Sequence, residues 1–253
     1  MIEIRSGREI ALMRKAGVIV ARVFEKLQGA IEPGITTKEL DDLAIKVIKS
    51  LNGEAAFLGY KGYPASICTS VNDVVVHGIP AATKVKSGSI LSVDIGVKYR
   101  GYFADAAATF PVGRISGEAM RLIEAAETAL EAGIEQARPG NRVSDISHAV
   151  QDLAESKGFS VVRAFVGHGI GSNLHEEPEI PNYGEPGKGA RLDPGMALAI
   201  EPMINEGTWE VKVLDDGWTA VTKDGKLSAH FEHTVLVTEG SAEVLTKWQR
   251  KSR

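Results

Sequence analysis

The same order of structural signals occurs twice along this chain, and this repeat restricts the possible folds most strongly. In each half, a predicted helix leads to a Pro-Gly pair, a second helix, a loop and a strand. The Pro-Gly pairs stand at 33–34 and 139–140, 106 positions apart, and the matching strands end at Asp94 and Glu201, 107 positions apart. Agreement of the offset at two separate landmarks indicates a duplicated sequence. We therefore predict a single domain over residues 1–253, with related halves at about 6–113 and 117–240.

Two duplicated halves of mixed helices and strands predict an α+β fold with pseudo-twofold symmetry. We expect antiparallel sheets to line a central cleft, helices to cover the outside, and acidic residues from both halves to converge in the cleft. Capping boxes at 6–9 and 36–39 mark the starts of two helices. Further helices are predicted at about 117–137 and from near 144 to 158, and strand patterns dominate the C-terminal third.

The segment 90–110 is predicted to form a β-hairpin with one aspartate in each strand. Apolar residues alternate with small or polar ones along the first strand, and Lys98-Tyr99-Arg100-Gly101 supplies the turn. A turn centred between Tyr99 and Arg100 sets Asp94 directly opposite Asp105, with Cβ atoms about 4.5–5.5 Å apart. Two partly buried carboxylates at that distance require a bound cation or a shared proton. The alternative is a solvated turn region with two unrelated acids.

Charge and cysteine usage exclude several classes of protein. The chain has 253 residues with 29 Lys and Arg against 33 Asp and Glu, a net charge of −4, so it lacks the basic surface that binds nucleic acid. A single cysteine, Cys68, excludes an intramolecular disulfide and suits a reducing compartment. No segment approaches the roughly 20 apolar residues that span a bilayer. We expect a cytoplasmic globular protein with no membrane partner.

The second half is predicted to add ligands to the two aspartates. The repeat maps Asp94 onto Glu201, and Glu232 stands in the partner strand. His168 lies in a glycine-rich segment, 167–171, that we interpret as a turn in which the glycines permit a close backbone approach. Four carboxylates and one imidazole suit Mn, Fe(II), Co or Mg, and bridging carboxylates can hold two such ions about 3.5–4 Å apart. The alternative for His168 and His175 is a pair of hydrogen-bonded structural histidines.

Four motifs together resemble type I methionine aminopeptidases, which have the pita-bread fold. They are FVGHGIGSNLHEEPEIPNY at 165–183, the two aspartates separated by ten residues, the AIEPM run and the HFEHT run, all in family order. The resemblance extends over essentially the whole chain. It implies a metal-dependent aminopeptidase that removes the N-terminal methionine from nascent proteins and peptides and prefers a small second residue. It also implies that a metal-bound hydroxide attacks the first peptide bond.

The resemblance also implies a role for each site residue. Two divalent ions (Co, Mn, Fe(II) or similar) would be held, with bridging by Asp105 and Glu232, by Asp94, Asp105, His168, Glu201 and Glu232. Glu201 would also handle the proton, His77 would contact the substrate nitrogen, and His175 would hydrogen-bond the scissile carbonyl. A neutral imidazole donor can stabilise the developing oxyanion. The methionine pocket would be lined by Phe57, Tyr60, Tyr63, Cys68, Phe165, Leu174 and Trp218, with His77 and His175 also contacting the substrate.

Some positions depart from part of the family. Some members have Cys at the position of Phe57, Phe at that of Leu174 and Gln at that of His230. The first two differences affect the shape of the pocket and leave its apolar character unchanged. The substrates would be N-terminal methionine peptides and nascent chains near the ribosome, and the enzyme would be a monomer.

Four alternatives are less consistent with the sequence. A proline-specific peptidase of the same fold carries a long N-terminal domain, which this chain does not show. A pita-bread binding module without metals should lack at least one ligand, yet all five are present. A structural cation-binding protein has no use for the two further histidines. A thiol mechanism through Cys68 and His77 is unnecessary where metal ions supply the nucleophile.

Overall fold

The computed structural model describes residues 2–250. Its helices are α1 (Gly7–Ala30), α2 (Thr37–Ser50), α3 (Gly117–Gln136) and α4 (Val143–Ser156), and a short 3₁₀ helix covers Tyr60–Gly62. The first half contains β1 (Glu54–Ala55), β2 (Ile67–Val71), β3 (Val74–Val76), β4 (Ile90–Tyr99) and β5 (Tyr102–Pro111). The second half contains β6 (Ser160–Val161), β7 (Gly167–Gly169), β8 (Glu176–Ile180), β9 (Ala197–Ile200), β10 (Met203–Asn205), β11 (Val211–Val213), β12 (Ala220–Thr222), β13 (Ser228–His230), β14 (Glu232–Leu236) and β15 (Glu243–Val244).

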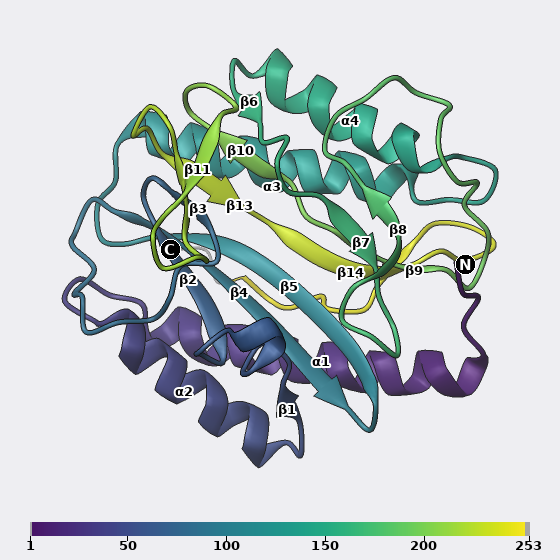
Figure 1. Ribbon diagram of the computed structural model, residues 1–253, viewed down its shortest axis with the longest axis horizontal. Coiled ribbons are helices and arrows are strands. Elements are labelled where there is room, and N and C mark those ends of the chain that lie inside the picture. The colour runs from purple at the N-terminus through teal and green to yellow at the C-terminus, as the bar shows by residue number, and fades with distance from the viewer. Residues whose placement is uncertain (1, 251–253) are drawn as a thin grey trace.

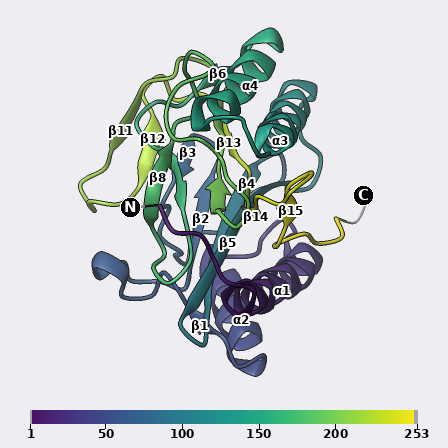
Figure 2. The same ribbon diagram turned by 90° about the vertical axis from the view of Figure 1, so that its right-hand side faces the viewer.

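Two pairs of helices cover a curved arrangement of antiparallel strands. The pair α1 and α2 lies at one end of the strands, and the pair α3 and α4 lies at the other (Figure 1). Figure 2 shows both pairs on one side of the strands, while β11, β12 and β8 lie on the opposite side. The mixed α+β class predicted from the sequence is confirmed. Among residues 2–250, no helix has both the length and the apolar character to span a bilayer.

The helix boundaries follow local capping chemistry. At the start of α1, the Ser6 hydroxyl accepts a hydrogen bond from the Glu9 backbone N–H, and the Glu9 carboxylate accepts one from the Ser6 N–H. Thr36 and Glu39 repeat this capping box at α2. Both predicted helix starts are therefore confirmed, because each box satisfies backbone donors that the first helical turn leaves free.

One nine-stranded sheet contains strands from both halves. Its main path runs β1-β4-β5-β14-β9-β7-β8, with β2 beside β4 and β15 beside β14. The halves join where β5 pairs with β14, at the antiparallel pairs Glu232 with Ala107 and His233 with Ala106. Two smaller three-stranded sheets complete the fold. Because β5 and β14 are neighbours, a carboxylate from each half lies at this junction.

The β4–β5 hairpin forms as predicted, but its predicted register is wrong. The turn consists of Arg100 and Gly101, both with positive φ, and Tyr99 pairs with Tyr102. This two-residue turn places Asp94 opposite Ala107, and Asp105 opposite Gly96. The two aspartates are therefore diagonal neighbours on the same face, since they stand two positions out of direct register. Positive φ at both central residues matches the right-handed twist of the strands, which explains why the turn shifts to Arg100-Gly101.

The segment 167–169 forms a strand, and the predicted turn around His168 is wrong. Strand β7 pairs with β9 on one side and with β8 on the other. A Cβ added to Gly167 would lie 2.4 Å from the Ala199 carbonyl oxygen, and one added to Gly169 would lie 2.1 Å from that of Glu177. The two glycines therefore permit the close backbone approach that we predicted, but between strands of a sheet and not in a turn.

Candidate metal centre and adjoining pocket

Four carboxylates reach the centre of the molecule from four different backbone positions. Asp94 projects from β4 and Asp105 from β5, while Glu232 begins β14 and Glu201 directly follows β9. Asp105 and Glu232 are each only 3% exposed. The β5–β14 and β14–β9 pairings bring these strands side by side. The five residues predicted as metal ligands therefore come together, since His168 on β7 pairs with Ala199 of β9.

Distances between side chains define the cluster. One ligand atom from each of Asp105, His168 and Glu232 lies within 4.8 Å of the others. The Nε2 atom of His168 is 3.6 Å from Asp105 Oδ2 and 3.5 Å from Glu201 Oε1. These separations are too long for hydrogen bonds to the imidazole. Side chains that share one small volume without direct hydrogen bonds are typical of groups arranged around an ion.

The tautomer of His168 follows from its backbone contact. Its Nδ1 lies 2.9 Å from the Gly169 carbonyl oxygen, which only accepts, so the proton is on Nδ1. Nε2 then presents a lone pair toward the acids. Burial lowers the pKa of His168 to about 4, which keeps the ring neutral. A neutral imidazole whose other nitrogen donates to a carbonyl is the usual form of a histidine ligand.

The pKa values of the carboxylates show how unfavourable their crowding is. Burial, together with neighbouring carboxylates, raises the pKa values of Asp94, Glu201 and Glu232 well above their ordinary range. Burial raises the pKa of Asp105 to about 6, although a hydrogen bond from Thr234 opposes the rise. Asp94 Oδ1 is buried without a hydrogen-bond partner among residues 2–250. Four hard oxygen donors and one imidazole nitrogen fit divalent cations, which would compensate this charge.

Thr234 supports the cluster and was not identified from the sequence. The backbone N–H of Asp105 donates to Thr234 Oγ1 at 2.9 Å, and that hydroxyl lies 2.9 Å from Asp105 Oδ1 and 2.8 Å from Asp105 O. Thr234 is fully buried. The only signal for it was its position two residues after Glu232, on the same face of the strand. Its contacts fix the rotamer of the Asp105 carboxylate.

His230 is a further buried histidine near the acids. Its Nε2 lies 3.9 Å from Glu201 Oε2 and has no hydrogen-bond partner among the described residues. Burial, with a smaller effect from His77, lowers its pKa to about 3, so the ring is neutral. The structure places His230 beside the predicted ligands, and no role was predicted for it.

An apolar pocket of about 160 Å³ adjoins the acid cluster. Its lining includes eight of the nine residues predicted to contact substrate, and adds one that was not predicted, Lys61. The lining residues are Phe57, Tyr60, Lys61, Tyr63, Cys68, His77, Leu174, His175 and Trp218. Phe165 is the ninth predicted residue, and it packs edge-on against the His77 ring at 5.4 Å without lining the cavity. The pocket opens beside the acids because Cys68 pairs directly with Asp94.

Aromatic rings give the pocket its shape. The Tyr63 hydroxyl donates to the carbonyl oxygens of Ile67 and Gly78, and its ring meets Trp218 edge-on at 5.1 Å. Gly96 leaves room for Phe57, whose ring would lie 2.4 Å from a Cβ at that position. Burial raises the pKa of the Cys68 thiol well above its ordinary value. A protonated thiol is a poor nucleophile, which agrees with our rejection of a thiol mechanism.

The two predicted catalytic histidines both line the pocket. His77 has a positive φ of 60°, and its ring meets Trp218 edge-on at 6.2 Å; burial lowers its pKa. His175 lies at the open mouth, 4.2 Å from the His168 ring, with Nδ1 2.8 Å from the Tyr60 hydroxyl. Partial removal from solvent and the nearby His168 lower its pKa to about 4. Both rings are neutral near pH 7 and can donate or accept a hydrogen bond.

Comparisons with known proteins agree on one family. The sequence profile described as metallopeptidase family M24 matches residues 11–239. The chain is 52% identical over 247 residues to methionine aminopeptidase 1 of Bacillus subtilis, covering 98% of this chain and 100% of that protein. It is 51% identical over 246 residues to a methionine aminopeptidase of Clostridium perfringens, covering 97% and 99%. A solved methionine aminopeptidase of Thermotoga maritima superposes with a TM-score of 0.96 at 49% identity, covering 98% of this chain and 100% of that one.

Proposed function

We propose that this chain, which belongs to metallopeptidase family M24, acts on nascent chains with a small second residue. It is a metal-dependent aminopeptidase that removes N-terminal methionine. Its fold is the pita-bread fold of that family. One observation carries the proposal: a buried cluster of acids and His168 opens directly onto an apolar pocket of about 160 Å³. The acid cluster is suited to hydrolysis, and the pocket is suited to an unbranched side chain.

We propose that two divalent ions would be held by Asp94, Asp105, His168, Glu201 and Glu232. Mn, Fe(II) and Co each suit a set of carboxylate and imidazole donors. Divalent ions held there supply Lewis acidity and lower the pKa of a water molecule. The raised pKa values of the acids support the proposal, because only nearby positive charge lets several buried carboxylates ionise together.

The protein's own side chains orient the substrate and move the proton in this proposal. Glu201 accepts a proton from the attacking water and passes it to the leaving amine. His175 donates a hydrogen bond to the scissile carbonyl oxygen as negative charge develops on it. His77, which lines the same pocket, contacts the substrate nitrogen. The neutral state of both rings supports these roles, because a neutral imidazole donates without carrying charge into the apolar pocket.

The pocket explains the proposed preference for methionine. The thioether lies among aromatic edges and the Cys68 sulfur, contacts that favour a polarizable side chain. Removal of a methylene costs only about 1–3 kcal/mol in such a pocket, so discrimination against leucine is finite. A charged first residue is rejected strongly, because its charge would be buried unpaired. The second residue faces the acid cluster, where space for Gly, Ala or Ser is proposed.

We also propose that the chain is one catalytic domain made of two related halves, 6–113 and 117–240. Isolated bridges support the duplication, since Thr36 pairs with Lys84 and Arg142 with Arg191, at offsets of 106 and 107 between the halves. The enzyme is further proposed to act as a monomer in the cytoplasm, near the ribosome. That placement rests on its substrates, because nascent chains expose their first methionine there.

A peptide series tests the function. The metal-free protein is reloaded with Mn(II), Fe(II) or Co(II) and given Met-Ala-Ser, Met-Gly-Ser, Met-Lys-Ser, Met-Leu-Ser, Ala-Pro-Ala and N-acetyl-Met-Ala-Ser. We expect cleavage of the first two peptides only. Comparable turnover of Met-Lys-Ser would contradict the small second residue, and cleavage of the acetylated peptide would contradict anchoring of the free α-amine. Turnover of Ala-Pro-Ala would favour a proline-specific peptidase.

A further inference from the structure

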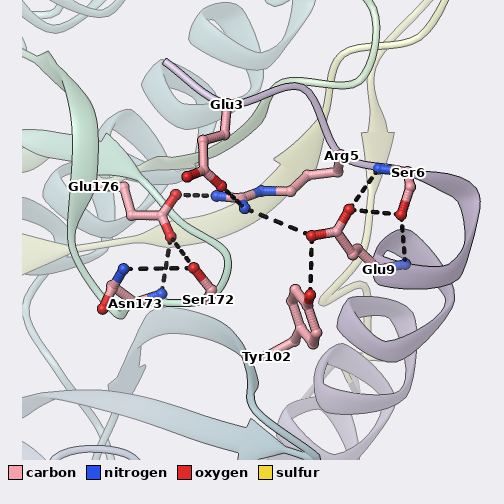
Figure 3. A network of polar contacts seen from close by, with 8 residues as sticks. All are labelled: Glu3, Arg5, Ser6, Glu9, Tyr102, Ser172, Asn173 and Glu176. Carbon is pink, nitrogen blue, oxygen red and sulfur yellow. Dashed lines mark hydrogen bonds and ion pairs between the residues drawn. The ribbon is translucent and has the colours of Figure 1, made fainter. Parts of the chain in front are cut away.

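The segment before α1 crosses to the second half of the chain and sends one arginine into the interior. The backbone N–H of Arg5 donates to the Gly195 carbonyl oxygen at 2.9 Å. Its side chain is then only 2% exposed. Figure 3 shows the guanidinium among three carboxylates, those of Glu3, Glu9 and Glu176. Burial of an arginine costs free energy unless the charge is paired. The three carboxylates compensate that charge, and the burial suggests that the contacts have a structural role.

The ion pair with Glu176 leads directly to the His175 turn, which we define as residues 171–176, the bend at 171–175 together with the first residue of β8. Arg5 Nη2 binds one oxygen of the Glu176 carboxylate. The other oxygen, Oε1, accepts the backbone N–H of Asn173 at 2.8 Å and the Ser172 hydroxyl at 3.2 Å. One carboxylate therefore ties the backbone of the turn, and Arg5 fixes that carboxylate (Figure 3).

Gly171 adds a second contact between Arg5 and the same turn. A Cβ at Gly171 would lie 2.2 Å from the Arg5 Cζ and Nη2 atoms, so the guanidinium lies flat against the backbone there. The Gly171 carbonyl oxygen accepts the Phe103 N–H at 2.9 Å, which joins the turn to β5. The last glycine of the GHGIG run thus provides the surface against which Arg5 packs.

The turn carries two residues of the pocket. Leu174 is buried and lines the cavity, and His175 lines it at the mouth. We propose that Arg5 is a positioning residue: through Glu176 and Gly171 it fixes the turn at 171–176, and so sets His175 against Tyr60 and the substrate carbonyl. This inference rests on the role proposed above for His175.

The same network extends to β5. The Tyr102 hydroxyl donates to Glu9 Oε1 at 2.9 Å, and Glu9 also accepts from Ser6 at the start of α1. The hydrogen bonds from Ser6, with smaller effects of Tyr102 and Arg5, lower the pKa of Glu9 to about 2. Tyr102 precedes Asp105 by three residues on the same strand. Arg5 therefore holds the His175 turn relative to the hairpin that carries two of the proposed ligands.

Three variants test this role: Arg5→Met, Arg5→Lys and Glu176→Gln. Displacement of a positioned group by about 1 Å costs up to about 100-fold in rate. We expect kcat on Met-Ala-Ser to fall about 10- to 100-fold for Arg5→Met and Glu176→Gln, with metal content unchanged. Arg5→Lys should lose less, because it keeps the charge but lacks the flat guanidinium. Assays are made well below each variant's Tm, so that unfolding does not contribute.

Arg14→Met is the matched control. Arg14 also belongs to the N-terminal region, and its Nε and Nη2 atoms bind the Glu243 carboxylate at 2.7 Å each. This ion pair joins α1 to β15 and does not reach the His175 turn. We expect an unchanged kcat for Arg14→Met. If Arg14→Met loses as much kcat as Arg5→Met, a general loss of stability explains both and the positioning role is wrong.

A double-mutant cycle separates positioning from stability. In a His175→Ala background, Arg5→Met should cause little further loss of kcat, because the group that it positions is absent. The proposal would be overturned if the fold loss of kcat in the double variant equalled the product of the fold losses in the two single variants. A kcat of Arg5→Met within about twofold of wild type would also overturn it. If Arg5→Met does not fold, the same double-mutant cycle is made with Arg5→Lys and Glu176→Gln, each combined with His175→Ala.

A second readout does not depend on turnover. In metal-free protein labelled with ¹⁵N-histidine, Arg5→Met should shift the imidazole resonances of His175, whereas Arg14→Met should leave them in place. Unchanged His175 resonances in Arg5→Met would overturn the positioning role. If the wild-type enzyme cleaves none of the methionine peptides, the proposed function fails, and the NMR comparison alone then decides the role of Arg5.

Discussion

The acid cluster and the apolar pocket meet at His168 and His175, yet the backbone holds them in different ways. Asp94, Asp105 and Glu232 lie within strands of one nine-stranded sheet. Most of the pocket comes from loops, including the 3₁₀ turn at 60–62, the segment at 171–176 and the loop before β12. A sheet fixes its side chains through several pairings, whereas a loop moves more easily. Loss of a metal ion or a side chain from the cluster should therefore reduce activity strongly, whereas a substitution in the pocket should reduce it only moderately.

Removal of the metal ions should have the largest effect. We expect chelation to abolish turnover and added Mn(II) to restore it. In the metal-free protein, the folded pKa of Asp105 is about 6 against an ordinary 3.8, so this carboxyl stabilises the fold at low pH. Its contribution is lost as the pH rises from about 3.8 to about 6.

The measurement is Tm across about pH 4 to about 7, with and without Mn(II). The gain in Tm from the metal should widen as the pH rises, because ionised carboxylates then face each other without compensation. A gain in Tm that narrows with rising pH would contradict the placement of the ions among these acids.

Asp105→Asn should come next in size. The amide keeps the volume of the carboxylate but removes a charge that compensates two cations. Residues that only support a ligand typically cost about 10- to 100-fold in metal affinity or activity, so loss of a proposed ligand should exceed that range in kcat/KM. Metal stoichiometry by elemental analysis provides the second measurement. Near-normal activity with normal metal content would remove Asp105 from the ligand set.

Thr234→Val tests whether the sheet holds the cluster through more than the ligands themselves. The valine keeps the shape but loses the hydroxyl that bonds the Asp105 backbone and carboxylate. We expect a loss of about 10- to 100-fold in metal affinity and of about 1–3 kcal/mol in the free energy of unfolding. The conservative Thr234→Ser should retain most of both. Equal behaviour of the Val and Ser variants would show that the hydroxyl has no role.

Cys68→Ser should have the smallest effect. Contacts of sulfur with aromatic rings are worth about 0.3–1.5 kcal/mol, so KM for Met-Ala-Ser should rise by about two- to tenfold while kcat is retained. Cys68 lies opposite Asp94, so the same variant also tests whether the pocket and the cluster are separable. Abolished kcat with the metals intact would restore the thiol mechanism that we rejected.

Local patterns predicted much of the fold. The capping boxes at Ser6 and Thr36 and the alternation in β4 depend on neighbours in sequence, and the structure confirms these elements. The hairpin register was wrong by two positions, because a four-residue turn segment allows more than one centre. The segment at 167–171 was interpreted as a turn because glycine is common in turns. Whether a glycine serves a turn or a close strand pairing depends on distant backbone, here Ala199 and Glu177.

The site residues also divide into those that sequence patterns predicted and those that depend on distant parts of the chain. The hairpin, the repeat and the motif resemblance together predicted the four acids and the one histidine that the structure brings together, and eight of the nine residues predicted to contact substrate line the pocket. Lys61 and Arg5 were not identified, because nothing beside them in sequence indicates their partners, and the only signal for Thr234 was its position two residues after Glu232. Arg5 binds a carboxylate 171 positions away. A pairing over that distance depends on how the two halves assemble, which no local pattern encodes.

The junction of β5 with β14 also has a consequence for how the enzyme comes into existence. Ala107 and Glu232 pair across 125 positions of chain, a contact that raises the contact order and slows folding. A growing chain that has not yet added β14 lacks Glu232, and with it the strand that joins the halves. The peptidase should therefore remain inert on the ribosome until its last large strand has been synthesised and docked. Activity should then begin only after β14 has docked against β5.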